Sequence, residues 1–152
     1  MLDGIDLNGR VAIVTGGYSG IGLEAVRAMA AKGARIVVPV RTPDKARDAL
    51  AGIEGRVRAV PMDLADLGSI RRFADEMADK LSRLDILINN AGIMACPEAR
   101  VGPGWESQFG VNHMGHFALT LALRPLLEKT PGARVVALSS TAHKISAIQW
   151  DD

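Results

Sequence analysis

Cysteine, aromatic residues and charge of one sign are all scarce in this chain of 152 residues. The single cysteine, Cys96, allows no internal disulfide and no cysteine-based metal cage, which is typical of a reducing compartment. The 18 basic and 17 acidic residues leave a net charge of +1, without the basic excess of a nucleic-acid binder. Aromatic residues make up 4% of the chain, too few for a base-stacking platform. We therefore expect no nucleic-acid partner.

Long apolar runs and a secretory leader are missing as well. No apolar run approaches the length that spans a membrane, and the first ten residues are too polar and acidic for a signal peptide. These features predict a soluble, cytoplasmic protein. The hydrophobic fraction of 48% and the charged fraction of 23% are ordinary for a globular domain. A chain of 152 residues is long enough for one core but not for two domains.

What the chain does have is an alternation of short apolar runs with segments of helical period. The runs predict five β-strands, at residues 10–15, 35–40, 56–60, 84–88 and 134–138. Helical patterns between them cover about residues 19–32, 43–50, 67–81 and 105–128. This order predicts an α/β fold, a doubly wound Rossmann-type parallel sheet with helices on both faces. Pro39 cannot donate a hydrogen bond within a sheet, so we expect its nitrogen to face no partner strand.

A glycine-rich turn joins the first strand to the first helix. Its glycines have the spacing G-x-x-x-G-x-G, which permits a tight turn, close approach of backbone N–H groups to a pyrophosphate, and close helix packing. Such a turn also occurs as a plain strand-to-helix connection, but its place between a buried strand and an amphipathic helix favours a dinucleotide site. The residues predicted to bind the cofactor here are Gly16, Tyr18, Ser19, Gly20, Ile21 and Gly22.

The residue after the second strand indicates which cofactor is bound. An acidic residue there would accept hydrogen bonds from the ribose hydroxyls of NAD and repel a 2′-phosphate. This chain has Arg41 at that place, with Lys45 one helical turn further on. A guanidinium binds phosphate through two parallel hydrogen bonds, so NADP is favoured over NAD. The alternative is two solvated cations at a helix start.

Two further motifs follow the third and fourth strands, at the sheet edge where open α/β folds hold ligands. Asp63 and Leu64 follow the third strand, and Asp63 is suited to accept a hydrogen bond from an adenine amino group. In the motif Asn-Asn-Ala-Gly at residues 89–92, Asn90 is expected to tie neighbouring loops together, and Ala91 and Gly92 leave room beside a ribose. Without this context the same four residues are simply good turn formers.

Together these motifs have the order and spacing of the short-chain dehydrogenase/reductase family, which the whole chain resembles. They are Thr15-Gly-x3-Gly-x-Gly22, Asp63-Leu64, Asn89-Asn-Ala-Gly92, Asn112 and Ser139-Ser140. Residues 111–117 and 134–143 are similar to the retinol-dehydrogenase-like branch of that family. The resemblance implies an oxidoreductase that transfers hydride between NADP(H) and a small alcohol or carbonyl substrate of lipophilic character. It also implies a homo-oligomer at full length.

The resemblance also implies roles for single residues. It gives Ser140 the role of holding the substrate oxygen, and it gives Asn112 a structural role in the long helix, where a distortion lets a water join a proton relay. An asparagine inside a helix competes for backbone hydrogen bonds, which agrees with a local break. Met94 and Cys96 follow the Asn-Ala-Gly motif, and we expect them to border the nicotinamide. No base is marked beside Cys96, so we interpret it as a loop residue and not as a nucleophile.

Two other groupings suggest different chemistry. His113 and His116 lie three residues apart on one helix and suit a pair of metal ligands, but no third ligand is marked by spacing. A packing or polar role is therefore favoured for them, and we predict no metal site. Ser140 and His143 suggest a hydrolase, but the G-x-S-x-G motif of such enzymes is missing.

The chain departs from the family at the proton donor. In the family this is a tyrosine in a Tyr-x-x-x-Lys motif after the fifth strand, whereas the only tyrosine here is Tyr18. We therefore interpret residues 1–152 as a single NAD(P)-binding Rossmann domain that is incomplete at its C-terminal end, before a sixth strand. This predicts an exposed edge at the fifth strand and exposure of Phe117 and Leu121. The alternative function is a catalytically inactive NADP-binding or interaction module.

Overall fold

A five-stranded parallel sheet forms the centre of the computed structural model, which describes residues 3–147. The strands stand in the order β3-β2-β1-β4-β7. They are β1 (Val11–Val14), β2 (Arg35–Val40), β3 (Arg56–Pro61), β4 (Ile86–Asn89) and β7 (Arg134–Ala137). These bounds differ from the predicted ones by at most two residues. The prediction of a doubly wound Rossmann-type sheet with about five strands is confirmed.

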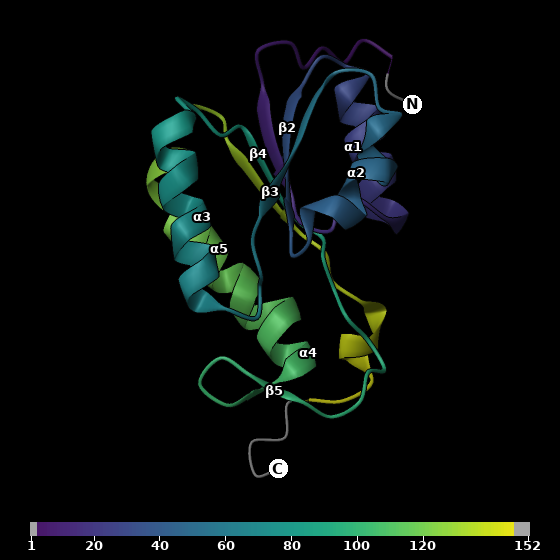
Figure 1. The fold of residues 1–152 in the computed structure, drawn as a ribbon, viewed down its shortest axis with the longest axis vertical. Helices are drawn as coiled ribbons and strands as arrows, with labels where there is room; N and C mark the ends of the chain where they lie inside the picture. The colour runs from purple at the N-terminus through teal and green to yellow at the C-terminus, as the bar shows by residue number, and fades with distance from the viewer. Residues whose placement is uncertain (1–2, 148–152) are drawn as a thin grey trace.

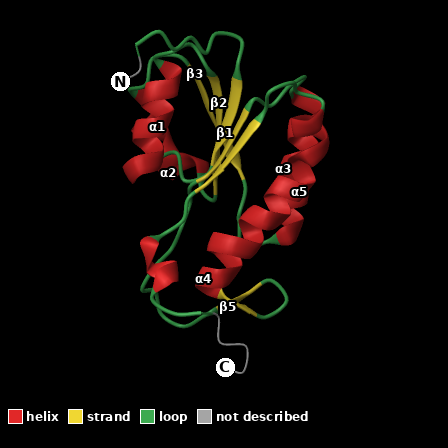
Figure 2. Ribbon diagram, turned by 180° about the vertical axis from the view of Figure 1, so that it is seen from behind, coloured by secondary structure: helices red, strands yellow, loops and turns green. Residues whose placement is uncertain are grey.

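Two pairs of helices cover the two faces of this sheet (Figures 1 and 2). On one face lie α1 (Gly20–Ala30) and α2 (Pro43–Ala51). On the other lie α3 (Leu67–Lys80) and α5 (His116–Glu128), side by side in both views. The helix dipole of α1 points its positive end at the carboxyl edge of the sheet, because parallel strands and their following helices run in opposite directions.

The core is split between the two faces by the two-residue period of the strands. In β1, Val11 and Ile13 join the cluster under α3 and α5, where Leu119 is fully buried. Ala12 and Val14, pointing the opposite way, join the cluster under α1 and α2. All four strand residues are thus buried, as the continuous apolar run predicts for a central parallel strand.

Pro39 lies inside β2, which is paired on both sides. The Arg35 N–H donates toward β1, to the carbonyl of Arg10 at 2.9 Å, and every second residue of a strand faces the same neighbour. The nitrogen of Pro39 therefore also faces the β1 side. The pairing of β2 with β1 ends at Val37, opposite Ile13. Pro39 thus lies beyond the end of that ladder, where no N–H is needed.

The segment predicted as one helix over about residues 105–128 is more complex. Its first two residues form β6 (Trp105–Glu106), which pairs with β5 (Arg100–Val101) in a hairpin. Three helical elements follow: α4 (Ser107–Phe109), the π-helical turn η1 (Gly110–Gly115) and α5. Trp105 was predicted in the helix but pairs with Val101, because two glycines of positive φ turn the chain back between them. Helix α4 starts after Glu106, whose carboxylate accepts hydrogen bonds from its first backbone N–H groups at 2.8 and 2.9 Å.

The strand β7 lies at one edge of the sheet, with all four of its residues exposed. Val135 and Val136 are each 46% exposed, and Phe117 and Leu121 on α5 are 55% and 51% exposed. The predicted exposure of the fifth strand and of this helix face is confirmed. Within residues 3–147, no helix combines the length and apolarity needed to cross a membrane.

Candidate cofactor site

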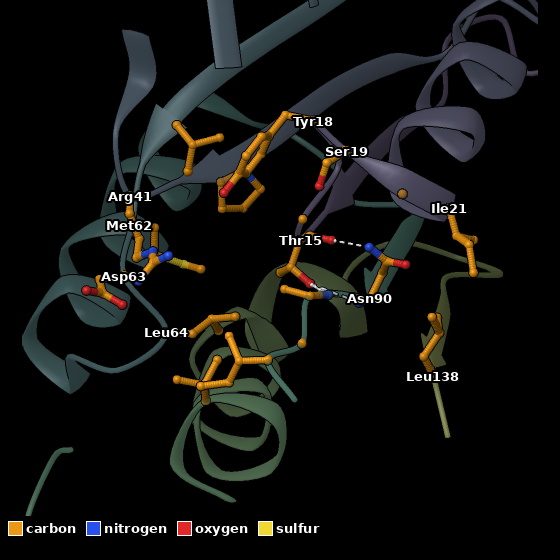
Figure 3. Close-up of a pocket in the computed structure, with 18 residues that line it drawn as sticks. Thr15, Tyr18, Ser19, Ile21, Arg41, Met62, Asp63, Leu64, Asn90 and Leu138 are labelled. Carbon is orange, nitrogen blue, oxygen red and sulfur yellow. Dashed lines mark hydrogen bonds between the residues drawn. The ribbon is translucent and has the colours of Figure 1, made fainter. Parts of the chain in front are cut away.

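A cavity of about 390 Å³ opens at the carboxyl ends of the strands, with β1, β2, β3 and β4 each ending at its wall (Figure 3). In open α/β sheets this edge, at the point where the strand order reverses, is the place where ligands bind. Most residues predicted to bind the cofactor lie on the wall: Gly16, Tyr18, Ser19, Ile21, Gly22, Arg41, Asp63, Leu64, Asn90, Ala91 and Gly92. Residues predicted from four separate segments of the sequence therefore line one cavity.

Two predicted residues lie just outside this wall. Lys45 lines a second, smaller hollow, which shares Tyr18 and Arg41 with the main cavity and is completed by Thr42. Gly20 begins α1, and a Cβ built on it would meet no heavy atom within 4 Å, so its backbone faces open space. The two hollows together form a longer site that extends from the glycine-rich turn past the end of β2.

Some residues on the wall were not predicted from the sequence. They are Thr15, Pro39, Val40, Met62, Ile93, Val111 and Leu138. Except for Val111, each lies within four residues of the end of a strand, so a search extended to every residue beside a strand end would have found them. Figure 3 shows Arg41, Met62 and Asp63 toward one end of the cavity and Ile21 with Leu138 toward the other. The site thus has a polar, charged end and an apolar end.

The glycine-rich turn brings the start of α1 close to the loop that follows β4. A Cβ on Gly22 would fall inside van der Waals contact with the Asn90 side-chain nitrogen and with the carbonyl oxygen of Gly16. Gly16 and Gly20 both have positive φ, which the tight turn requires. The N-cap residue, Ser19, makes no side-chain capping hydrogen bond, and the first turn of α1 has no acidic residue. The first N–H groups of this helix are therefore available to an anion, and they fit a pyrophosphate.

Thr15 and Asn90 join the ends of β1 and β4 beneath the cavity floor. The Thr15 hydroxyl oxygen accepts hydrogen bonds from the backbone N–H groups of Asn90 (2.9 Å) and Ala91 (3.0 Å). The Asn90 side chain donates in return to the Thr15 carbonyl at 2.9 Å (Figure 3). Asn90 therefore ties two loops together, as the sequence predicts.

Positive charge gathers at the end of β2. Arg41 and Lys45 are both exposed, and within residues 3–147 neither takes part in an ion pair. Asp44, the acidic residue in the first turn of α2, instead pairs with Arg47. On the neighbouring strand end, the Asp63 carboxylate accepts from the Ala65 N–H at 2.9 Å and is held at the cavity wall. The two cations are thus available to a phosphate.

Asn112 lies in the π-helical turn η1 and holds the loop after β4 from the other side. Its side-chain oxygen accepts from the Ile93 N–H, and its side-chain nitrogen donates to the Ile93 carbonyl, both at 2.8 Å. The expected break in the long helix is therefore present at Asn112. The water relay that the resemblance implies is not tested by this structure and stays a prediction.

The two helical histidines have separate environments. His113 is exposed and stacks on Phe109, with ring centroids 5.3 Å apart. His116 is only 6% exposed, and its ring contacts Thr15 and the Asn112 carbonyl. Burial lowers the pKa of His116, with a smaller lowering from the nearby His113. The two rings have different partners, and residues 3–147 contain no cluster of three or more His, Cys, Asp or Glu suited to a metal ion.

The remaining predicted residues lie away from the cavity wall. Ser140 is exposed, three residues beyond the end of β7, and its carbonyl contacts the His143 ring. Leu138, two residues earlier, is the part of this segment that reaches the cavity. Met94 is 87% exposed and Cys96 has its sulfur 3.7 Å from the Ser107 hydroxyl. Neither residue lines this cavity, and the prediction that they border the nicotinamide stays a prediction.

Comparison with known proteins agrees with this arrangement. The sequence model of the family described as "short chain dehydrogenase" matches residues 10–151. The chain belongs to the short-chain dehydrogenase family. Mouse retinol dehydrogenase 12 is 41% identical over 97% of this chain and 48% of that protein. This short-chain dehydrogenase chain spans about half the length of the curated relatives it matches.

Solved structures also resemble the chain. An uncharacterised protein from Mycobacterium paratuberculosis is 43% identical, with a TM-score of 0.81 over 93% of this chain and 50% of that one. The complex of Pseudomonas aeruginosa RhlG with NADP is 34% identical, with a TM-score of 0.78 over 95% of this chain and 59% of that one. Both matches cover more than nine-tenths of this chain.

Proposed function

We propose that this chain is the cofactor-binding part of an oxidoreductase that transfers hydride between NADP(H) and a lipophilic alcohol or carbonyl substrate. The observation that carries the proposal is the joined cavity at the carboxyl edge of the sheet. It combines free N–H groups at the start of α1 with the two cations Arg41 and Lys45 at the end of β2. An anion of pyrophosphate size suits the first group, and a second phosphate suits the other.

The choice of NADP over NAD rests on the charge beside the ribose position. The end of β2 carries Arg41 where an NAD-binding site has a carboxylate. The hollow that Arg41 shares with Tyr18, Thr42 and Lys45 offers two cations and two hydroxyls to a 2′-phosphate. The NADP complex of RhlG, a relative with the same fold, supports this choice.

When bound, the nicotinamide supplies or accepts the hydride. The apolar end of the cavity, with Ile21 and Leu138, suits the nicotinamide side. We propose that the Ser140 hydroxyl holds the reacting oxygen and donates a hydrogen bond as charge develops on it. The proton donor would come from outside residues 1–152. The names of the retinol dehydrogenases among the relatives support a lipophilic substrate.

A second function is favoured by one observation, the lack of a Tyr-x-x-x-Lys motif in these residues. Taken alone, the chain would then bind NADP without turnover and act as a nucleotide-binding or interaction module. The homo-oligomer and the cytoplasmic location predicted from the sequence stay predictions.

Substitution of Arg41 tests the cofactor part of the proposal. Arg41→Asp replaces a phosphate-binding fork by a group that accepts from ribose hydroxyls and repels a 2′-phosphate. A charge-assisted phosphate contact is worth about 1.5–3 kcal/mol, so the ratio of the NADP and NAD dissociation constants should change by at least about tenfold toward NAD. Calorimetric titration of the chain with both nucleotides measures this ratio.

The matched control is Arg47→Asp, which makes the same change of charge on α2 away from both hollows. It should leave the ratio within about twofold of the original. An unchanged ratio in Arg41→Asp would show that Arg41 is a surface cation.

To test the reaction itself, a longer protein that includes a Tyr-x-x-x-Lys motif is assayed for NADPH oxidation with a panel of lipophilic aldehydes and ketones. Oxidation of NADPH supports the enzyme, and binding without any oxidation supports the module.

A further inference from the structure

His116 lies at the first position of α5, between the cofactor-binding loops and the π-helical turn. Its side chain is buried beneath the cavity wall, and its two ring nitrogens contact two different segments. Nε2 lies 2.8 Å from the Thr15 hydroxyl oxygen at the end of β1. Nδ1 lies 2.8 Å from the carbonyl oxygen of Asn112 in η1. The cofactor chemistry described above uses neither contact.

The partners of the ring determine where its proton lies. A carbonyl oxygen only accepts, so Nδ1 carries the proton and donates it to Asn112. The Thr15 hydroxyl oxygen already accepts from the N–H groups of Asn90 and Ala91, which fills its two acceptor positions. The Thr15 hydroxyl proton has two acceptors within reach, Nε2 of His116 at 2.8 Å and the carbonyl oxygen of Ile88 at 3.3 Å. With Nδ1 donating to Asn112, Nε2 of the neutral ring is an acceptor, and the shorter of the two contacts pairs it with the Thr15 hydroxyl. A protonated Nε2 would demand a third acceptor position on Thr15, so the geometry fits the neutral ring alone.

This single ring couples the two segments that form the loop wall of the cavity. Thr15, which contacts one side of the ring, holds the backbone N–H groups of Asn90 and Ala91. The Asn90 side chain in turn packs against the start of α1. On its other side the ring contacts the Asn112 carbonyl in η1. The Asn112 side chain forms two hydrogen bonds with the backbone of Ile93, one as acceptor and one as donor. The loop that follows β4 is thus held at both of its ends by contacts that converge on His116.

We propose that His116, in its neutral Nδ1–H form, is a positioning residue for the NADP site, holding the loop after β4 against the glycine-rich turn. This inference rests on the proposed binding of NADP. Protonation of His116 would place a proton on Nε2, which would compete with the N–H groups of Asn90 and Ala91 for the Thr15 oxygen and would release the loop from β1. The affinity for NADP would then fall at acidic pH through a group that does not touch the cofactor.

The surroundings of the ring leave few other groups to account for such a pH dependence. Within residues 3–147, its ring forms hydrogen bonds with Thr15, which follows β1, and with Asn112 of η1, and the His116 carbonyl accepts from Thr120 on α5. None of these three side chains titrates. His113, one turn earlier, is the titratable group whose charge acts on His116. The control variant His113→Gln removes this group.

The first test observes the ring directly in the chain without nucleotide. Long-range ¹H–¹⁵N correlation spectra of the imidazoles distinguish a protonated Nδ1 from a protonated Nε2. At pH 7.5 we expect His116 to show a protonated Nδ1 and a bare Nε2. A ring with the proton on Nε2 would overturn the inference, because the ring would then donate to the Thr15 oxygen and not accept from it.

The second test measures NADP⁺ affinity from pH 8 to pH 5.5 for the unmodified chain, His116→Gln and the control His113→Gln. The 2′-phosphate itself titrates near pH 6, so each variant is compared with the unmodified chain at the same pH. His116→Gln should bind about tenfold more weakly at pH 8, and the difference should shrink toward none as the pH falls below 6.5. His113→Gln should match the unmodified chain throughout. A constant ratio for His116→Gln at every pH would show a merely structural role and overturn the inference.

Two substitutions of Thr15 keep the inference testable if His116→Gln does not fold. Thr15→Ser retains the hydroxyl and should bind NADP⁺ within about twofold of the unmodified chain. Thr15→Val retains the shape without the hydroxyl and should bind about tenfold more weakly. Equal affinity of these two would refute the link through Thr15.

If the unmodified chain binds no NADP⁺ at any pH, the proposed function fails. The backbone amide resonances of Asn90 and Ala91 then decide the inference, because they should shift as His116 is protonated.

Discussion

The side chain of Asn112 and the backbone of Ile93 form a reciprocal pair, in which each donates one hydrogen bond to the other at 2.8 Å. Such a pair imitates one rung of a β-ladder, with a side-chain amide in place of one strand. It connects η1 to a residue on the cavity wall. Asparagine is the shortest side chain whose acceptor and donor are two separate atoms, as this arrangement requires, which gives a structural reason for an asparagine inside a helical segment.

Removal of this pair should weaken NADP binding. Asn112→Ala deletes both hydrogen bonds while leaving the helix backbone intact, and the loop at Ile93 is then free to move. The pair is exposed, so we expect a loss of about 1 kcal/mol in stability and a several-fold weaker NADP affinity. Thermal unfolding and calorimetric titration measure the two effects.

The matched control for that variant is Gln108→Ala. The Gln108 side chain accepts a hydrogen bond from the Ala95 N–H at 3.1 Å, on the same loop but beyond the part that lines the cavity. Its loss should affect stability slightly and NADP affinity hardly at all. Equal losses of affinity in both variants would show that the loop responds as a whole and that Asn112 has no special position.

The close approach at Gly22 predicts a second, larger effect. In Gly22→Ala the new methyl group would overlap the Asn90 side chain and the Gly16 backbone, and backbone cannot move aside without opening the turn. Overpacking of this kind costs about 1–3 kcal/mol, and we expect NADP binding to be lost or reduced more than tenfold. Gly52→Ala is the control, because a Cβ there meets no heavy atom within 4 Å. Retained NADP affinity in Gly22→Ala would mean that the turn is not where the pyrophosphate binds.

Much of this site follows from local sequence, and the rest depends on contacts far apart in the chain. The five strands and the turn at residues 15–22 were predictable because buried strands and glycine spacing are local patterns. Trp105 was misplaced because its helical period continues that of α5, whereas the hairpin is decided by glycines on the other side of it. The role of His116 depends on Thr15, 101 residues away, and spacing along one helix carries no information about that partner.

Asp85, at the opposite end of β4, should make the stability of the fold sensitive to acid. Asp85 is buried there between Arg83 and Arg10, with hydrogen bonds of 2.6–2.9 Å from both and from the Val11 N–H. Burial alone would raise the pKa of Asp85, but these hydrogen bonds outweigh it and lower the pKa from 3.8 to about 2. Because the folded chain holds the charged form, this stabilisation of about 2 kcal/mol is present above pH 4 and is lost as the pH falls toward 2.

Urea unfolding as a function of pH tests this statement. The free energy of unfolding should fall between pH 4 and pH 2, and Asp85→Asn should lower it by about 3 kcal/mol at pH 7, since two arginines then lose their buried partner. In Asp85→Asn the part of the acid dependence that belongs to Asp85 should disappear. Asp75→Asn, on the exposed side of α3, is the control and should change the unfolding free energy by less than about 0.5 kcal/mol. A similar loss in both variants would exclude a special role for the Asp85 cluster.

Substitution of Ser140 distinguishes a role in cofactor binding from a role in the reaction. It lies outside the cavity wall, three residues beyond β7, so Ser140→Ala should leave the NADP affinity of this chain within about twofold of its original value. In a longer protein that contains the proton donor, the same substitution should lower turnover by about 10²–10³, the usual effect of losing one donor to a developing oxyanion. Ser139→Ala, one residue earlier, should affect neither quantity. If Ser140→Ala instead weakens NADP binding equally in both proteins, Ser140 holds the nucleotide or the strand end, and the substrate oxygen must be held by another group.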